Sequence, residues 1–322
     1  MTLRTGVPES VDPDLLHYFP PGIEIIRVPS KPTGSFEVEF WIPPFHQSAA
    51  VEVFPHLKGV KVAQSMLAGV DWLLKLVPAT VQVCDGQGLH NAATAEWVLA
   101  AILASLKYFP FYCALQAEGN WRRRKEVNAA YRLLHNETKT FNPPVLVEEL
   151  AGKTVLIVGY GSIGKSIEDR LLPFGINVLR VARSSRPGVE PVSALKSLLP
   201  TADIVVLIVP LTAKTTGMIG AEEIALMRQG ALLVNAARGP VVNTEALMNA
   251  LSEGKIRAAI DVSDPEPLPE DHPLWHAPNL LITPHIAASS PRFLQRSIAF
   301  AAEQAARYMA GKPLLNTVEG DY

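Results

Sequence analysis

Three short motifs in the second half of the chain carry side chains suited to acid–base chemistry and anion binding. They are residues 235–239, 261–267 and 283–287. Arg238 can bind a carboxylate through two parallel hydrogen bonds and polarise an adjacent carbonyl group. His285 can deliver a proton to the carbonyl oxygen, and Glu266 can orient the histidine and raise its proton affinity. Each residue alone has a structural explanation, as a surface ion pair, a loop carboxylate or a core histidine, but together they predict a catalytic set.

A glycine motif lies upstream of these three motifs in the sequence. The apolar run at residues 154–158 leads directly into Gly159-x-Gly161-x-x-Gly164. Gly159 permits a tight turn, Gly161 lets the backbone approach phosphates, and Gly164 lets the next helix pack closely on the strand. The helix start offers unpaired N–H groups to an anion. This arrangement predicts a dinucleotide cofactor.

The next strand end indicates which dinucleotide is bound. An NAD site needs a carboxylate about 20 residues beyond the glycines, to bind the ribose 2′-hydroxyl. The chain has Ala182-Arg183-Ser184-Ser185-Arg186 there, without Asp or Glu. Arginine binds a 2′-phosphate through charge-assisted hydrogen bonds. We therefore expect NADP(H), with NAD(H) as the weaker alternative, unless this segment is only a solvated basic loop.

Strands and helices alternate through the second half of the chain, which predicts a parallel sheet covered on both faces. The motifs above then follow strand ends, at the rim where open α/β sheets bind ligands. A smaller α/β unit precedes this domain, and a last helix at residues 291–310 is expected to return to it. The expected domains are residues 1–98 with 289–322, and residues 99–288. The expected elements are strands at 23–28, 36–40, 60–64, 81–84, 154–158, 178–181, 204–208, 231–235, 258–262 and 280–282, and helices at 49–54, 70–76, 91–118, 163–172, 192–199, 222–227, 244–253 and 291–310.

Composition excludes several other classes of protein. The 322 residues are 48% hydrophobic, which is ample for buried cores, and the net charge of −2 argues against a nucleic-acid partner. No uninterrupted apolar run approaches membrane-spanning length, and the N-terminus lacks the apolar core of a signal peptide. Cys84 and Cys113 stand in no metal-ligand spacing, so no metal is expected. These features favour a cytoplasmic enzyme with free thiols.

The region at residues 91–150 is the least regular. It begins with one apolar helical run, broken near Pro110. Helices this long and apolar usually cross between domains or form a subunit interface, and we expect a homodimer through this region. The basic run at residues 122–125 could contact phosphates, although a solvated face or an inter-subunit patch of salt bridges fits better.

At these motifs the chain resembles the D-isomer-specific 2-hydroxyacid dehydrogenases, over nearly its full length. The resemblance rests on the order of the glycine fingerprint, Pro210-Leu211-Thr212-x-x-Thr215, Ala237-Arg238-Gly239, Asp261-Val262 with Glu266-Pro267, and Pro284-His285. Within the family it is most similar to the glyoxylate/hydroxypyruvate reductase A branch. That similarity lies at residues 41–44, 68–71, 273–275 and 283–288.

The resemblance implies a Rossmann cofactor domain, a smaller discontinuous flavodoxin-like substrate domain, and closure of the two during hydride transfer. It implies that Arg238 binds the substrate, that His285 is the general acid/base, and that Glu266 is its partner. Backbone N–H groups of Ala68 and Gly69 would bind the substrate carboxylate, and Asp261 the nicotinamide carboxamide. The full set of expected cofactor contacts is Thr94, Gly159, Gly161, Ser162, Ile163, Gly164, Arg183, Ser184, Arg186, Pro210, Thr215, Ala236, Ala237, Arg238, Asp261 and His285.

Departures from the family leave the substrate and the function partly open. Residues 66–68 and 287–289 replace glycines found in many relatives. Trp41, Phe45, Met66 and Leu67 could form an apolar wall that admits larger 2-oxoacids such as phenylpyruvate, or could be ordinary core. Formate dehydrogenases share the fold but carry Gln where Glu266 stands, which argues against that activity. A dinucleotide-sensing regulatory protein is the alternative outside enzymes.

Overall fold

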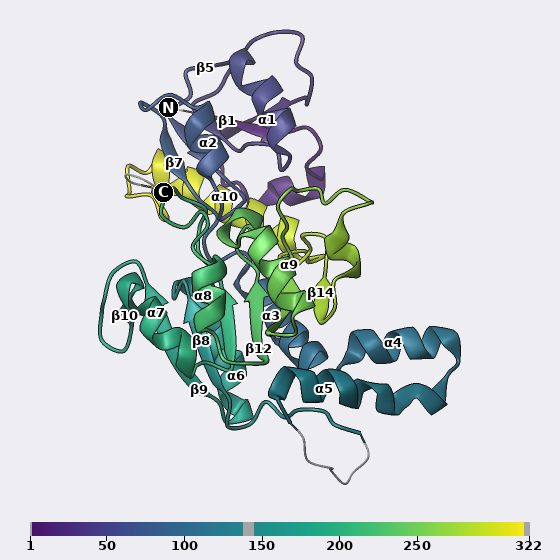
Figure 1. Cartoon of the computed structure of the whole chain (residues 1–322). Coiled ribbons are helices and arrows are strands. Elements are labelled where there is room, and N and C mark those ends of the chain that lie inside the picture. Colours follow the sequence, from purple (N-terminus) through teal and green to yellow (C-terminus); the bar gives the residue numbers. More distant parts are fainter. Residues whose placement is uncertain (1, 138–144, 319–322) are drawn as a thin grey trace. The chain divides into compact units, whose positions relative to one another are not determined.

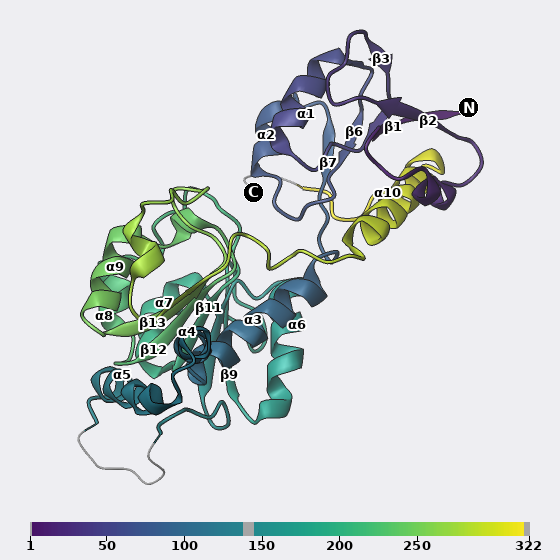
Figure 2. The same ribbon diagram turned by 90° about the vertical axis from the view of Figure 1, so that its right-hand side faces the viewer.

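The structure, a computed structural model, describes residues 2–137 and 145–318. It divides the chain into two units: Met1–His90 with Ser290–Tyr322, and Asn91–Ser289 (Figures 1 and 2). The expected boundary at residues 98 and 99 therefore needs correction, because it would cut helix α3 (Asn91–Leu106). The buried side chains of α3 share one core with helix α6 (Ser162–Leu171), so the whole helix belongs to the second unit.

The second unit contains a seven-stranded sheet in the order β10-β9-β8-β11-β12-β13-β14, with every described pair of neighbours parallel. The first strand of this unit, β8, lies inside the sheet, and later strands are added on both sides of it, which is the doubly wound order of dinucleotide-binding folds. The fold class expected from the sequence is thus confirmed. The strands are β8 (Thr154–Val158), β9 (Asn177–Ala182), β10 (Glu190–Pro191), β11 (Ile204–Leu207), β12 (Ala231–Asn235), β13 (Ile256–Ile260) and β14 (Leu280–Ile282).

Successive side chains along a strand of this sheet pack into the cores on its two opposite faces. Val155 and Ile157 of β8 pack with α3 and α6, whereas Leu156 and Val158 pack in the core of the opposite face. Side chains on a strand point alternately to opposite faces, so a continuous apolar strand needs cover on both sides. The helices on that opposite face are α7 (Leu195–Leu198), α8 (Ala221–Leu226) and α9 (Thr244–Ser252).

The first unit has a five-stranded parallel sheet in the order β2-β1-β4-β6-β7. Helix α10 (Phe293–Met309) returns from the far end of the sequence and covers one face, while α1 (Gln47–Val53) and α2 (Asp71–Leu76) cover the other. This order is the flavodoxin-like arrangement. The strands are β1 (Leu3–Pro8), β2 (Ile23–Val28), β4 (Phe40–Trp41), β6 (Val62–Gln64) and β7 (Gln82–Cys84), with β3 (Phe36–Glu37) and β5 (Leu57–Lys58) as a separate pair.

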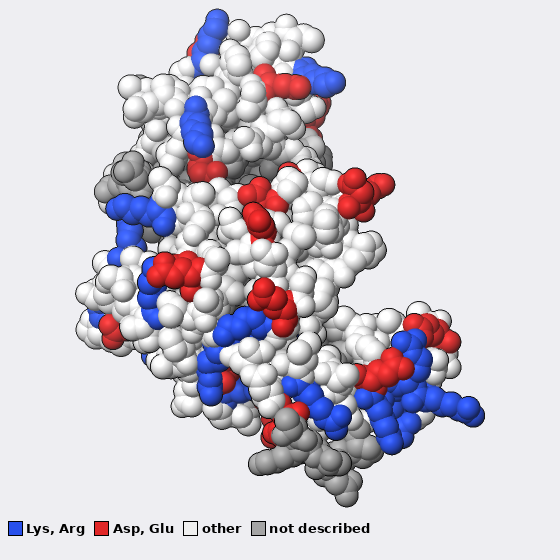
Figure 3. All heavy atoms as spheres, viewed as in Figure 1, with Lys and Arg blue, Asp and Glu red and all other residues white. Residues whose placement is uncertain are grey.

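Two helices, α4 (Phe109–Glu118) and α5 (Val127–His135), form a hairpin at one side of the second unit (Figure 1). The 3-10 helix at Trp121–Glu126 joins them and carries the basic run. Arg123 pairs there with Glu118 and Glu126, all on the surface, and Figure 3 shows the two charge signs mixed on this hairpin. The solvated interpretation of this run therefore fits the structure. The Asn-Pro-Pro sequence at residues 142–144 lies outside the described residues.

No single helix in the described part of the chain is long and apolar enough to cross a membrane. Helices α3 and α4 taken together have the length and apolar composition of a membrane span, but the pair is bent by 68° at the break between them.

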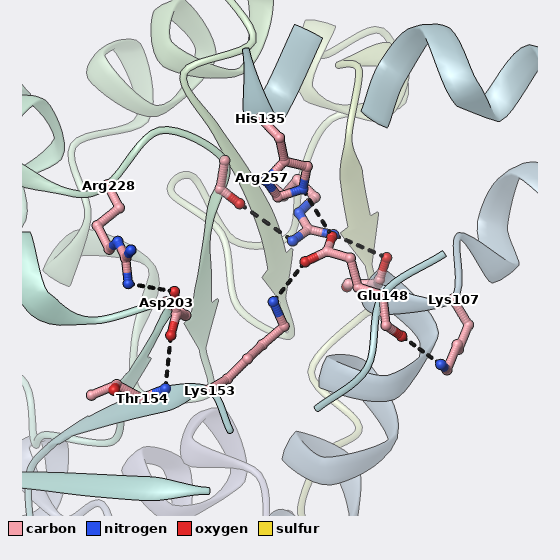
Figure 4. A network of polar contacts seen from close by, with 10 residues as sticks. Lys107, His135, Glu148, Lys153, Thr154, Asp203, Arg228 and Arg257 are labelled. Atoms are coloured by element: carbon pink, nitrogen blue, oxygen red, sulfur yellow. Dashed lines mark hydrogen bonds and ion pairs between the residues drawn. The ribbon is translucent and has the colours of Figure 1, made fainter. Parts of the chain in front are cut away.

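A buried ionic network lies at the amino ends of the strands in the second unit (Figure 4). The carboxylate of Glu148 accepts hydrogen bonds from His135 (3.1 Å) and Lys153 (2.7 Å), and it pairs with the buried Arg257 at 2.7 Å. Burial would raise the pKa of Glu148, but the His135 hydrogen bond and the charges of Arg257 and Lys153 together lower it to about 2. Through these contacts Glu148 connects the segment after α5 to β13 and to the residue that precedes β8.

Candidate active site

The glycine loop between β8 and α6 has the geometry of a phosphate-binding turn. Gly159 has a φ of +105°, and a Cβ there would lie 2.4 Å from the carbonyl oxygen of Ile208. A Cβ at Gly164 would lie 2.9 Å from the carbonyl oxygen of Gly159, whereas one at Gly161 would meet nothing within 4 Å. Helix α6 starts with no side-chain cap, so its first N–H groups are available to an anion. The loop thus fits a dinucleotide pyrophosphate.

The segment after β9 places basic side chains beside this loop. Arg186 donates a hydrogen bond to the carbonyl oxygen of Tyr160, and its guanidinium lies 5.8 Å from the centre of the tyrosine ring. Arg183 and Ser184 are exposed, and Arg183 makes no hydrogen bond or ion pair with any described residue. One guanidinium therefore lies at the glycine loop, and a second is available to a ligand.

Other residues expected to contact the cofactor make hydrogen bonds or packing contacts within the second unit. The hydroxyl of Thr215 donates to the carbonyl oxygen of Pro210 (2.6 Å), and that of Ser162 donates to Oδ1 of Asn91 (3.2 Å). Thr94 is buried in α3, and Ile163 packs against the core that α3 shares with α6. Their contacts to the cofactor therefore stay a prediction from the sequence.

The turn that carries Arg238 is fixed by its own motif. The buried Asn235 donates from Nδ2 to the carbonyl oxygen of Arg238 (3.0 Å) and accepts from the N–H of Ala237 (3.0 Å). A Cβ at Gly239 would lie 1.9 Å from the carbonyl oxygen of Ser263. Only glycine therefore allows this turn to touch the loop that carries Glu266. The roles of Asn235 and Gly239 were not predicted from the sequence, although both residues stand inside the motif.

His285 and Glu266 form a hydrogen-bonded pair, with Nδ1 of the histidine 2.6 Å from Oε1 of the glutamate. This hydrogen bond raises the pKa of His285, and it outweighs the opposing effects of partial burial and the charge of Arg238. The same bond lowers the pKa of Glu266, and Arg238 lowers it further. Both side chains are partly exposed. The three residues singled out from the sequence therefore interact electrostatically within one site.

The Asp261 carboxylate has a clear structural task. It is buried and accepts hydrogen bonds from the Thr283 hydroxyl (2.6 Å) and the N–H groups of Ile286 (2.8 Å) and Ala287 (2.7 Å). Trp97 of α3 donates in turn to the Thr283 hydroxyl (3.0 Å). Asp261 therefore fixes the loop that carries His285, a task that the sequence argument missed.

Ala68 and Gly69 belong to the first unit, in the loop that follows β6. Of the four residues considered for an apolar wall, Trp41 and Met66 are buried core, whereas Phe45 is half-exposed and Leu67 partly exposed. Phe45 packs edge-on against Phe293, with ring centres 5.6 Å apart. Only Phe45 and Leu67 are thus exposed enough to contact a ligand.

Comparisons with known proteins show which family the chain is similar to. Residues 99–287 match the family model described as D-isomer specific 2-hydroxyacid dehydrogenase, NAD binding domain. A glyoxylate reductase of Thermofilum pendens is 34% identical over 272 residues, which cover 81% of this chain and 75% of the relative. The solved NADPH-dependent glyoxylate/hydroxypyruvate reductase of Sinorhizobium meliloti, in complex with NADP and sulfate, is 26% identical, has a TM-score of 0.80, and the match covers 99% of this chain and 98% of that one.

The chain therefore belongs to the D-isomer-specific 2-hydroxyacid dehydrogenase family, and the similarities support its glyoxylate/hydroxypyruvate reductase branch. Its second unit is the cofactor domain of an NAD(P)-dependent dehydrogenase.

Proposed function

We propose that the protein reduces a small 2-oxoacid, of the glyoxylate or hydroxypyruvate class, to the D-2-hydroxyacid with NADPH. The observation that carries this proposal is the His285–Glu266 pair, which shares a site with Arg238 in the unit that carries the glycine loop. A partly exposed histidine with a raised pKa is suited to proton donation near neutral pH.

The residues divide the reaction between them. Arg238 binds the substrate carboxylate and polarises the carbonyl, while the N–H groups of Ala68 and Gly69 contribute to carboxylate binding. NADPH held at the glycine loop would supply the hydride that the carbonyl carbon accepts. His285 transfers its proton to the carbonyl oxygen, and Glu266 stabilises the protonated imidazole before this transfer. In the reverse direction neutral His285 removes the hydroxyl proton.

The preference for NADPH is supported by the basic side chains after β9. Arg186 contacts Tyr160 of the glycine loop, Arg183 is exposed three residues earlier in the chain, and no carboxylate ends the strand. The Sinorhizobium meliloti relative was solved with NADP, and a 27% identical structure from Xanthobacter autotrophicus contains NADPH. We propose that the remaining cofactor contacts are those expected from the sequence, with Asp261 near the nicotinamide carboxamide.

A homodimer through residues 91–150 also belongs to this proposal. Phe109, Trp121 and Leu133 are large apolar side chains, and all three are exposed in this region. Sedimentation equilibrium would show a dimer, and a monomer would contradict this part. We further propose a cytoplasmic location, because both Cys84 and the exposed Cys113 are free thiols, which suits a reducing compartment.

Half-exposed Phe45 favours one second candidate, a reductase for larger 2-oxoacids such as phenylpyruvate. The experiment for both candidates is a panel of 2-oxoacids, with kcat/KM measured for NADPH and NADH. We expect the highest kcat/KM for glyoxylate or hydroxypyruvate with NADPH. A maximum at phenylpyruvate would favour the second candidate. Tight cofactor binding without turnover of any 2-oxoacid would instead favour a regulatory sensor.

A further inference from the structure

The loop that carries Ala68 and Gly69 rests directly on the backbone of another loop of the first unit. The N–H of Gly86 donates to the carbonyl oxygen of Leu67 (2.8 Å). A Cβ at Gly86 would lie 2.6 Å from the carbonyl oxygen of Met66 and 2.8 Å from its carbonyl carbon. Both contacts are with backbone atoms, which cannot rotate away as a flexible side chain can. Any larger residue at position 86 must therefore move residues 66–67.

Two fully buried amide side chains tie the start of this loop to its surroundings. Nε2 of Gln64 donates to the carbonyl oxygens of Ser65 (2.8 Å) and Asp85 (3.0 Å). Nε2 of Gln304 in α10 donates to Oε1 of Gln64 (2.8 Å) and to the carbonyl oxygen of Leu315 (2.7 Å). A buried, fully bonded polar network specifies one arrangement, because each unmade bond would leave a desolvated polar group.

The segment after α10 completes this support. The N–H of Asp85 donates to the carbonyl oxygen of Asn316 (3.0 Å), and Nδ2 of Asn316 donates to the carbonyl oxygen of Gln87 (3.0 Å). Asn316 has a φ of +53°, a conformation that asparagine and glycine tolerate better than other residues. The C-terminal segment thus fixes residues 85–87, and these residues fix the loop that carries Ala68 and Gly69.

We propose that Gly86, the Gln64–Gln304 pair and Asn316 are positioning residues for substrate binding, which act by setting the conformation of the loop at residues 65–70. This inference rests on the proposed function, in which the N–H groups of Ala68 and Gly69 bind the substrate carboxylate. Binding groups must be held within a fraction of an ångström, and a shift of about 1 Å caused by a remote substitution can cost roughly 10²-fold in rate.

The test compares Gly86→Ala and Asn316→Gly with matched controls. Gly34→Ala is the control for the first, because a Cβ at Gly34 would meet nothing within 4 Å. Asn136→Gly is the control for the second, because Asn136 is an exposed asparagine with a φ of +49°. We expect both test variants to raise the KM for glyoxylate at least tenfold, by the loss of loop position argued above. The Kd for NADPH should stay unchanged, since the cofactor binds the other unit.

A substitution that merely destabilised the fold would lower the active fraction, and so kcat, without raising KM. An unchanged KM in both variants, with the parent active, would overturn the inference. If Gly86→Ala does not fold, Asn316→Gly decides, because glycine tolerates the same backbone conformation.

Amide hydrogen exchange separates this inference from the proposed function. Exchange at residues 65–70 should be faster in both test variants than in the parent and the controls, while exchange at residues 154–164 should not change. A parent that reduces no 2-oxoacid would contradict the proposed function, and exchange would still report on the loop. Unchanged exchange at residues 65–70 would overturn the positioning inference whatever the activity.

Discussion

His285 and Glu266 reach each other from two loops, and the backbone of His285 is held in the left-handed region with a φ of +55°. The N–H of His285 donates to the carbonyl oxygen of Asp261 (2.7 Å), and the Asp261 carboxylate binds the next two N–H groups along the loop. The imidazole is thus oriented through its backbone as well as through Glu266. The Glu266 carboxylate has a further effect, because its hydrogen bond to the imidazole raises the pKa of His285.

Replacing Glu266 with Gln should lower the pKa of His285, because the hydrogen-bonded carboxylate is the main cause of its raised value. Reduction needs protonated His285, so kcat/KM for reduction should begin to fall at a lower pH than in the parent. The pH profile of kcat/KM with glyoxylate measures this shift. Glu270→Gln is the matched control, because Glu270 is an exposed carboxylate farther along the same loop. Superimposable profiles for Glu266→Gln and the parent would show that the two side chains are not coupled.

Arg238→Lys should reduce activity strongly although it keeps the positive charge. An ammonium group cannot reproduce the two parallel donors that bind a carboxylate and polarise the adjacent carbonyl. We expect a higher KM for the 2-oxoacid and a loss of about 10²-fold or more in kcat/KM. Arg228→Lys, at a surface pair with Asp203, is the control and should retain parental kinetics. An effect confined to the KM for NADPH would contradict the role given to Arg238.

The cofactor preference should depend on the basic residues after β9. Each paired contact between arginine and the 2′-phosphate should favour NADPH by roughly 10- to 100-fold. The double substitution Ala182→Asp with Arg183→Ala should reverse the preference, since it adds repulsion and removes attraction. The measurement is the ratio of kcat/KM for NADPH to kcat/KM for NADH, and Arg132→Ala, at an exposed arginine of α5, is the control. Equal kcat/KM values for NADPH and NADH in the parent would mean that this segment is a solvated loop.

Glu148→Gln should destabilise the second unit, because it leaves the buried guanidinium of Arg257 without a counter-charge. Breaking such a pair typically costs about 3–5 kcal/mol in the free energy of unfolding. The folded-state pKa of Glu148 is about 2, below its ordinary value. Its contribution should therefore be complete at neutral pH and be lost as the pH falls from about 4.5 towards 2.

Urea unfolding at several pH values measures the difference between the parent and Glu148→Gln. The exposed neighbour Glu149 provides the control, Glu149→Gln, which should unfold like the parent. A difference that stays constant down to pH 2 would contradict the role of the Glu148 charge.

The sequence predicted the second unit closely, because its strands are short apolar runs followed by glycine or polar turns. The limits of β8, β12 and β14 are those expected. Strand β1, the second strand in the sheet of the first unit, was not predicted, because Arg4, Gly6 and Pro8 obscure its apolar pattern. The expected break near Pro110 is present: α3 ends at Leu106 and α4 begins at Phe109, with Pro110 in its first turn, where proline is tolerated.

The three motif residues of the site were predicted from their chemistry, but the contacts that hold them were not. The approach of Gly239 to Ser263, and the bonds from Asp261 to the His285 loop, join segments that are separate in sequence. The Gln64–Gln304 pair joins residues 240 positions apart. Such contacts depend on how the loops fold over the strand ends, and no local pattern specifies this.

The most direct test of the proposed reaction compares His285→Ala with the parent in NADPH-dependent reduction of glyoxylate, alongside NADPH binding by fluorescence. His285 supplies a proton rather than a main binding contact, so the variant should bind NADPH like the parent. Its kcat should fall by roughly 10²–10⁴-fold, the usual contribution of a general acid. The predicted results are a parent that oxidises NADPH with glyoxylate, and a variant that binds the cofactor with the kcat lowered to this extent. A near-normal kcat in His285→Ala would contradict the account.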